Sequence, residues 1–175
     1  SSHLAIGEAF RTVQRGDADL AICGGAESRI NPMGIMRQAL LKRLNESSND
    51  APAAALRPFD AAAAGSVVGE GGGLFVLEEY EHAKKRGAKI YAEVAGGGMS
   101  ADAYHITAPH PEGAGITKVM YDALEEAGLK TSDVDYVNTH GTSTPLGDIG
   151  EIKAIQKVFG EHAYKLNISS TKSMT

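Results

Sequence analysis

Apolar stretches of strand length alternate with amphipathic stretches of helix length along most of this chain. Residues 20–23 form a continuous apolar run that ends at Gly24 and Gly25, a pattern typical of a buried strand. Residues 116–127 carry apolar side chains at helical spacing and stop at Gly128. Strands that alternate with helices indicate βα units around a largely buried sheet, so the sequence predicts an α/β fold. Further helices are predicted at 6–13, 33–44, 78–86 and 145–159, and further strands at 66–68, 74–77, 90–94, 134–138 and 166–169.

The glycine-rich segment at residues 69–73, GEGGG, invites comparison with a nucleotide-binding loop. A dinucleotide-binding fingerprint requires a helix directly after its glycines. Here an apolar strand is predicted to follow, so we expect a tight turn between two strands. Close packing of backbones is therefore favoured over a phosphate site.

Composition narrows the classes of function. The chain has 22 acidic and 17 basic residues, a net charge of −5, which argues against an electrostatic nucleic-acid partner. No run approaches the roughly 18 apolar residues of a membrane span, and no signal segment opens the chain. The single cysteine, Cys23, excludes a disulfide framework and is typical of a reducing compartment. The sequence predicts a cytoplasmic protein without nucleic-acid or membrane partners.

Two groups of reactive side chains can be set aside. Asp102, His105 and His110 could be imagined as metal ligands, but their spacing matches no helical or strand face, and no metal is expected. Cys23 could be a nucleophile, but it lies in an apolar strand without an adjacent cation. Buried cysteines of that kind are usually inert.

His140 is the strongest candidate for chemistry. It follows the strand predicted at 134–138 and precedes Gly141, three hydroxyl residues and Pro145. Active sites of open α/β sheets lie at the carboxyl ends of strands, and a glycine lets a substrate approach the backbone. Pro145 is suited to the first position of a helix, with Thr144 as a candidate cap. The alternative is a capped surface turn without a function.

The segments YVNTHGTSTPLGD and NISSTKSMT resemble the β-ketoacyl-acyl-carrier-protein synthases, in particular the type II, long-chain elongating condensing enzymes. DADLAICGGAES, RPFD, GEGGGLFVLEEYEHAKKRGAKIYAEV and SADAYHIT follow in the family's order. The resemblance implies a thiolase-like fold of five layers (αβαβα), of which this chain is an incomplete central part. Residues 1–95 would end the first half and residues 96–175 would begin the second, with both termini truncated.

The resemblance also implies a reaction. Condensing enzymes of this family move an acyl group to a cysteine, decarboxylate malonyl-acyl-carrier protein and join the two in a Claisen condensation during fatty-acid elongation. They need no cofactor, because phosphopantetheine arrives on the carrier protein. An acyl carrier protein as partner and a homodimer are therefore expected.

Catalytic positions can be assigned only by this resemblance. His140 matches the first catalytic histidine and Lys172 the lysine of the lysine–serine motif. The nucleophilic cysteine is expected upstream of Ser1 and the second histidine after Thr175. The fragment alone is therefore expected to be inactive.

Several substrate-binding positions follow in the same way. Thr142 and Thr144 resemble the threonines that bind phosphopantetheine, and Asp102, His105 and Thr107 resemble the loop that lines the same tunnel. Lys42 matches a basic residue that faces the carrier protein, although a solvated lysine is an equal alternative. Gln38 stands beside the acyl pocket, where the family often has phenylalanine.

The helix at 145–159 carries two carboxylates on its apolar stripe. Asp148 and Glu151 share a face with Ile152, Ile155 and Phe159, since residues three and four apart are neighbours. Charges there are costly unless they are paired. By the family resemblance we predict a buried Glu151–Lys172 ion pair with Asp148 close by. The alternative is a rotated helix that keeps both carboxylates at its wet margin.

Departures from the family pattern leave other interpretations open. Ala63, Ala64 and Ser66 replace the usual Arg-Asp pair and phenylalanine. Loss of the charged pair would loosen the loop or mark an unusual lineage. A non-catalytic partner like the chain-length factors, a polyketide-type ketosynthase and a nucleotide-binding module are the rival functions. Retention of both His140 and Lys172 favours an enzyme.

Overall fold

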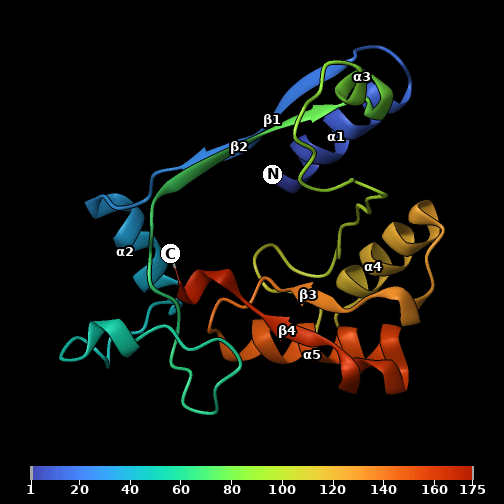
Figure 1. Cartoon of the computed structure of the whole chain (residues 1–175). Coiled ribbons are helices and arrows are strands. Elements are labelled where there is room, and N and C mark those ends of the chain that lie inside the picture. The colour runs from blue at the N-terminus through green and yellow to red at the C-terminus, as the bar shows by residue number, and fades with distance from the viewer. Residues whose placement is uncertain (1, 175) are drawn as a thin grey trace.

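The computed structural model describes residues 2–174. Its helices are α1 (Ser2–Gln14), α2 (Pro32–Leu40), α3 (Tyr80–Lys85), α4 (Ala114–Ala127) and α5 (Pro145–Phe159). Its strands are β1 (Leu20–Glu27), β2 (Gly71–Glu78), β3 (Tyr136–Asn138) and β4 (Asn167–Ser169) (Figure 1). Short 3-10 helices lie at Pro52–Ala54, Thr131–Asp133, Gly160–Lys165 and Thr171–Ser173. No helix within residues 2–174 is long and apolar enough to cross a membrane.

The first sheet pairs β1 and β2 in antiparallel register, from Leu20 opposite Glu78 to Glu27 opposite Gly71. The predicted hairpin between 66–68 and 74–77 is wrong, because the glycines at 71–73 are part of β2 itself. A side chain at Gly24 would collide with the carbonyl oxygen of Gly73. The glycines therefore allow close approach of two backbones, as the sequence indicated.

Only one face of this sheet is covered. Cys23 is buried on the face where α1 packs, but Ile22 is 69% exposed and its neighbours Leu74 and Val76 are 74% and 58% exposed. The prediction of a fully buried strand at 20–23 is therefore wrong, because no described element packs on the opposite face.

The second sheet pairs β3 and β4 in parallel, with Tyr136 opposite Asn167. Helix α5 packs beside it and forms the main core, which consists of Ile155, Val158, Phe159 and Ala163 with partly buried Met120, Leu124, Val134, Val137, Ile152, Leu166 and Ile168 around it. The bounds of α5 agree with prediction, and Asp148 and Glu151 are both buried on its core side. The alternative with both carboxylates at a wet margin is wrong.

Residues 90–94 form no strand. The chain instead runs irregularly until α4 begins, and its glycines lie against that helix. A side chain at Gly96 would come within 2.7 Å of the Ala123 carbonyl oxygen. The predicted strand at 90–94 is therefore wrong, since no described strand pairs with these residues.

Candidate active site

His140 lies in a turn that leaves the carboxyl edge of the parallel pair β3–β4, as predicted. The preceding Thr139 is buried, and both its N–H and its hydroxyl donate to the Ser169 carbonyl oxygen, at 2.9 and 3.0 Å. The Ser170 hydroxyl donates to the Gly141 carbonyl oxygen at 2.9 Å. The end of β4 therefore fixes the backbone on both sides of His140.

Glu151 holds the same turn from α5. Its Oε1 accepts the His140 N–H at 2.7 Å and its Oε2 accepts the Gly141 N–H at 2.9 Å. Hydrogen bonds to a carboxylate are stronger than those between neutral groups. Glu151 therefore works as a clamp on the backbone that carries the histidine.

The predicted Glu151–Lys172 ion pair is wrong. Lys172 is exposed, and no ion pair within 4.0 Å joins it to Glu151 in the described chain. Both oxygens of Glu151 already accept backbone N–H groups, which compensate the buried charge without the lysine.

Asp148 lies near Glu151 in α5, as predicted, but its carboxylate contacts a different segment of the chain. Its Oδ2 accepts the Phe59 N–H at 2.9 Å, which attaches the loop before β2 to the first turn of α5. Its other oxygen, Oδ1, is buried without a hydrogen-bond partner in the structure.

The environment of His140 favours the neutral imidazole. Loss of water contact lowers the pKa of His140, and the positive charge of Lys172 lowers it further. The carboxylates of Glu151 and Asp148 act in the opposite direction. His140 is exposed at the surface of this chain, and the net effect of these groups is a pKa below that of a free imidazole. Lys172 therefore acts on the histidine through space.

Thr142 and Thr144 lie together in the turn. Their hydroxyl oxygens are 2.9 Å apart, and Ser143 between them is completely buried with a left-handed φ of 63°. Thr144 occupies the cap position of α5 as predicted, but its side chain makes no cap hydrogen bond. The two hydroxyls thus form one polar pair beside His140.

Asp102, His105 and Thr107 are exposed, and two of them stabilise their own loop. The carboxylate of Asp102 accepts the N–H groups of His110 and Gly115, each at 2.9 Å. His105 Nδ1 accepts the Thr107 N–H at 3.1 Å. Their contact with phosphopantetheine stays a prediction.

Two other predicted positions lie on or near α2. Gln38 is half-buried, and Lys42 is exposed with a φ of 52° just after the helix. Neither side chain makes a described hydrogen bond to the His140 turn. Their assignments to the acyl pocket and the carrier protein stay predictions.

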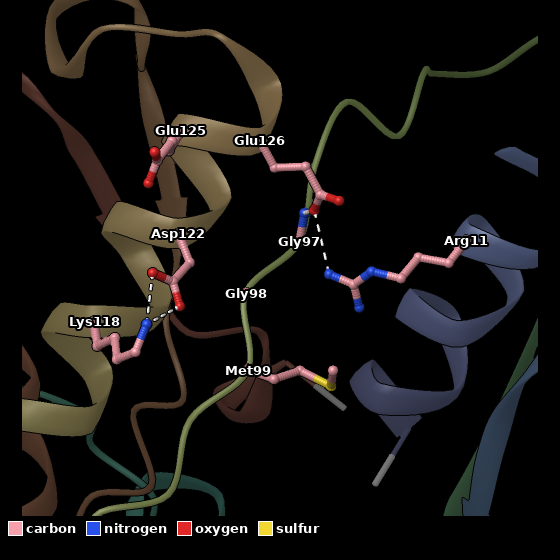
Figure 2. Close-up of a pocket in the computed structure, with 8 residues that line it drawn as sticks. All are labelled: Arg11, Gly97, Gly98, Met99, Lys118, Asp122, Glu125 and Glu126. Carbon is pink, nitrogen blue, oxygen red and sulfur yellow. Dashed lines mark hydrogen bonds and ion pairs between the residues drawn. The ribbon is translucent and has the colours of Figure 1, made fainter. Parts of the chain in front are cut away.

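A separate open pocket of about 470 Å³ lies between α1 and α4 (Figure 2). Arg11 reaches from α1 to Glu126 at 3.5 Å, and Glu126 also accepts the Gly97 N–H at 2.7 Å. None of the predicted site residues lines it. Within residues 2–174, no group of three or more His, Cys, Asp and Glu side chains could hold a metal ion.

Sequence reasoning missed the loop that covers the His140 turn. The Arg57 N–H donates to the Ser143 hydroxyl and the Gly65 N–H to the Ser143 carbonyl oxygen, both at 3.1 Å. The RPFD motif marked this loop in the chain, but backbone donors leave no signal in residue types.

Comparisons with known proteins agree with this geometry. The family "Beta-ketoacyl synthase, N-terminal domain" matches residues 1–83, and "Beta-ketoacyl synthase, C-terminal domain" matches residues 91–175. The chain is 53% identical over 171 residues to 3-oxoacyl-[acyl-carrier-protein] synthase 2 of Staphylococcus aureus, covering 98% of this chain and 42% of that protein. The synthase 2 of Coxiella burnetii is 52% identical over 97% of this chain and 41% of its own length.

Solved structures point the same way. One is a complex of a type II PKS acyl-carrier protein with its ketosynthase bound to the hexaketide. It matches with a TM-score of 0.96 and 38% identity, over 99% of this chain and 43% of that chain. The chain therefore spans about two fifths of the length of its relatives, and the predicted thiolase-like α/β fold is confirmed. The chain belongs to the β-ketoacyl synthase family.

Proposed function

We propose that this chain is part of a β-ketoacyl-acyl-carrier-protein synthase that elongates fatty acids. His140 carries the proposal, because Glu151 holds its backbone at the carboxyl edge of β3–β4 and because desolvation and the charge of Lys172 lower its pKa. The 53% identity to a synthase 2, against 38% to the polyketide ketosynthase, favours fatty-acid over polyketide substrates.

The neutral imidazole supplies the donor that decarboxylation requires. Its ring N–H donates to the malonyl thioester oxygen while the bond to the carboxylate breaks, carbon dioxide leaves and the electron pair moves into the enolate. The enolate carbon then attacks the acyl thioester, forms the new carbon–carbon bond and releases the cysteine thiolate. A donor fixed before the charge develops stabilises the transition state, and the Glu151 clamp fixes this one.

The polar residues around the turn bind the substrate arm. The hydroxyls of Thr142 and Thr144 bind the phosphopantetheine, and the loop with Asp102, His105 and Thr107 lines its path. Gln38 lies beside the acyl chain, and Lys42 faces the acidic carrier protein. The ketosynthase in complex with a carrier protein among the similar structures supports that partner.

The complete protein is proposed to be a cytoplasmic homodimer without a cofactor of its own. Residues 1–95 belong to its first half and residues 96–175 to its second. The nucleophilic cysteine and the second histidine belong to parts of the protein outside this segment.

The test is a condensation assay on the full-length protein that carries this chain. With acyl-carrier protein and malonyl-carrier protein as substrates, we expect β-ketoacyl product and carbon dioxide in equal amounts. Correctly folded protein that releases neither would refute the proposal and favour a non-catalytic partner subunit.

A further inference from the structure

Two side chains join three loops around the His140 turn. Arg43 Nη2 donates to the Thr107 carbonyl oxygen at 2.8 Å. The Ser66 hydroxyl donates to the Thr142 carbonyl oxygen at 2.7 Å. The two residues are themselves joined, because the Ser66 N–H donates to the Arg43 carbonyl oxygen at 2.7 Å. We call this continuous path from Thr107 to Thr142 the Arg43–Ser66 linkage.

The backbone leaves the Ser66 hydroxyl little freedom. Leu44 and Ser66 form a parallel bridge, and the Asn45 N–H donates to the Ser66 carbonyl oxygen at 3.0 Å. The preceding Gly65 is buried at a φ of 127°, and a side chain there would come within 2.7 Å of the Leu44 carbonyl carbon. The pairing of the Ser66 backbone with Leu44 and Asn45 therefore keeps the Ser66 hydroxyl beside the Thr142 carbonyl oxygen.

The linkage connects the two segments that the proposed function assigns to one substrate arm. Thr107 stands in the loop that lines the path of that arm, and Thr142 in the turn that binds it. Lys42, the proposed carrier-protein contact, is the neighbour of Arg43 in the chain. Phenylalanine, the residue common at position 66 in the family, has no hydroxyl to make this hydrogen bond.

We propose that Arg43 and Ser66 are positioning residues that hold the Thr107 loop and the Thr142–Thr144 turn at a fixed separation. They thereby set the affinity of the protein for the pantetheine arm of its substrate. This inference rests on the proposed function. The departure from the family at Ser66 then adds an attachment between the loop and the His140 turn.

The experiment compares Ser66→Ala, Ser66→Thr, Arg43→Met and the Ser66→Ala/Arg43→Met double variant in the full-length protein. Each is assayed with malonyl-carrier protein and with malonyl-pantetheine, which has no carrier protein. Loss of one such hydrogen bond is expected to raise KM about three- to tenfold for both substrates. The kcat should change less than about twofold, because the arm is bound equally in the ground state and the transition state. Ser66→Thr keeps the hydroxyl and should restore KM. Ser132→Ala is the matched control, because its hydroxyl bonds only to Asp133 in the short 3-10 helix Thr131–Asp133.

The double variant tests whether Arg43 and Ser66 fix the separation of the two loops together. Because breaking either bond uncouples the loops, its KM should equal that of the worse single variant. A multiplied effect would overturn the linkage. So would an unchanged KM in Ser66→Ala, no restoration by Ser66→Thr, or an Arg43→Met effect confined to the carrier-protein substrate.

Amide hydrogen exchange tests the Arg43–Ser66 linkage independently of catalysis. The linkage predicts faster exchange at residues 139–144 in Ser66→Ala and at residues 105–108 in Arg43→Met. Unchanged exchange in both would contradict it. An unsubstituted protein that does not condense would refute the proposed function alone, since the exchange result still tests the linkage.

Discussion

At the scale of single residues, the charge balance around His140 governs the proposed chemistry. Lys172 lowers the pKa of His140, and Glu151 raises it. Lys172→Met should therefore raise the pKa of His140, because removing a positive neighbour makes the imidazolium less costly. The measurement is an NMR titration of the imidazole, and the acid limb of the pH–rate profile should move to higher pH with it. An unchanged or lower pKa would mean that Lys172 does not act on the ring.

The clamp on the His140 turn gives a second prediction at this scale. Glu151→Gln sets an amide NH₂ against one of the two backbone N–H groups that Glu151 now accepts. A buried donor left unsatisfied costs about 1–3 kcal/mol, so the free energy of unfolding should fall by about that amount. Urea unfolding measures it, with Lys153→Gln as control because Lys153 pairs only at the surface with Glu112. Equal stability of Glu151→Gln and wild type would argue against the clamp.

Which side chains are buried near His140 was predictable, but their partners were not. Helical spacing placed Asp148 and Glu151 on the apolar stripe of α5, the family resemblance favoured burial over a wet margin, and both are buried there. The ion pair with Lys172 was wrong because Glu151 bonds to backbone N–H groups. Every residue but proline carries such a donor, so spacing of side chains cannot identify it.

At the scale of elements, the junction of β2 and α3 is held by the carboxylate of Glu78. The side chain of Glu78 is 8% exposed and accepts two bonds from Arg86, both at 2.6 Å, and one contact from His82, also at 2.6 Å. Mainly because of the Arg86 hydrogen bonds, the pKa of Glu78 falls to about 2. The charged carboxylate therefore ties the end of the strand to the helix.

This junction predicts a pH dependence of stability. The pKa of Glu78 is lower in the folded protein than in the unfolded chain, where it is about 4.3. The contribution of Glu78 to folding stability is therefore complete above about pH 4.3 and is lost as the pH falls toward about 2. Glu78→Gln should lower Tm at pH 6, and the difference from wild type should shrink between about pH 4 and pH 2. Glu81→Gln is the control, since Glu81 pairs only with exposed Lys84. A difference that is constant with pH would contradict the assignment.

Elements with strong periodicity were predictable, whereas strand pairing was not. The bounds of α5 and the Gly128 end of α4 agree with the sequence. The hairpin at 66–77 was wrong because β2 pairs with β1, about fifty residues earlier. Residues 90–94 have strand composition, but no described strand lies beside them to pair with. Such choices depend on distant partners that local patterns do not contain.

At the scale of the whole molecule, the uncovered face of β1–β2 decides how the 175-residue chain behaves by itself. Ile22, Leu74 and Val76 present contiguous apolar surface beside an open sheet edge, a combination that favours association. The isolated chain should form concentration-dependent oligomers in light scattering, and it should show no condensing activity. Replacing Leu74 and Val76 by threonine should reduce the association. A monomeric or catalytically active isolated chain would contradict this view.

In the proposed reaction, neutral His140 donates to the malonyl thioester during decarboxylation and is not needed to acylate the cysteine. The most direct measurement follows both half-reactions in the full-length protein carrying His140→Ala, with radiolabelled acyl-carrier protein for acylation and malonyl-carrier protein for carbon dioxide release. Carbon dioxide release should be lost, while acyl transfer to the cysteine should stay within about tenfold of the unsubstituted protein. That change is small beside the roughly hundredfold or more that general acid–base catalysis contributes. Equal loss of both half-reactions would contradict it.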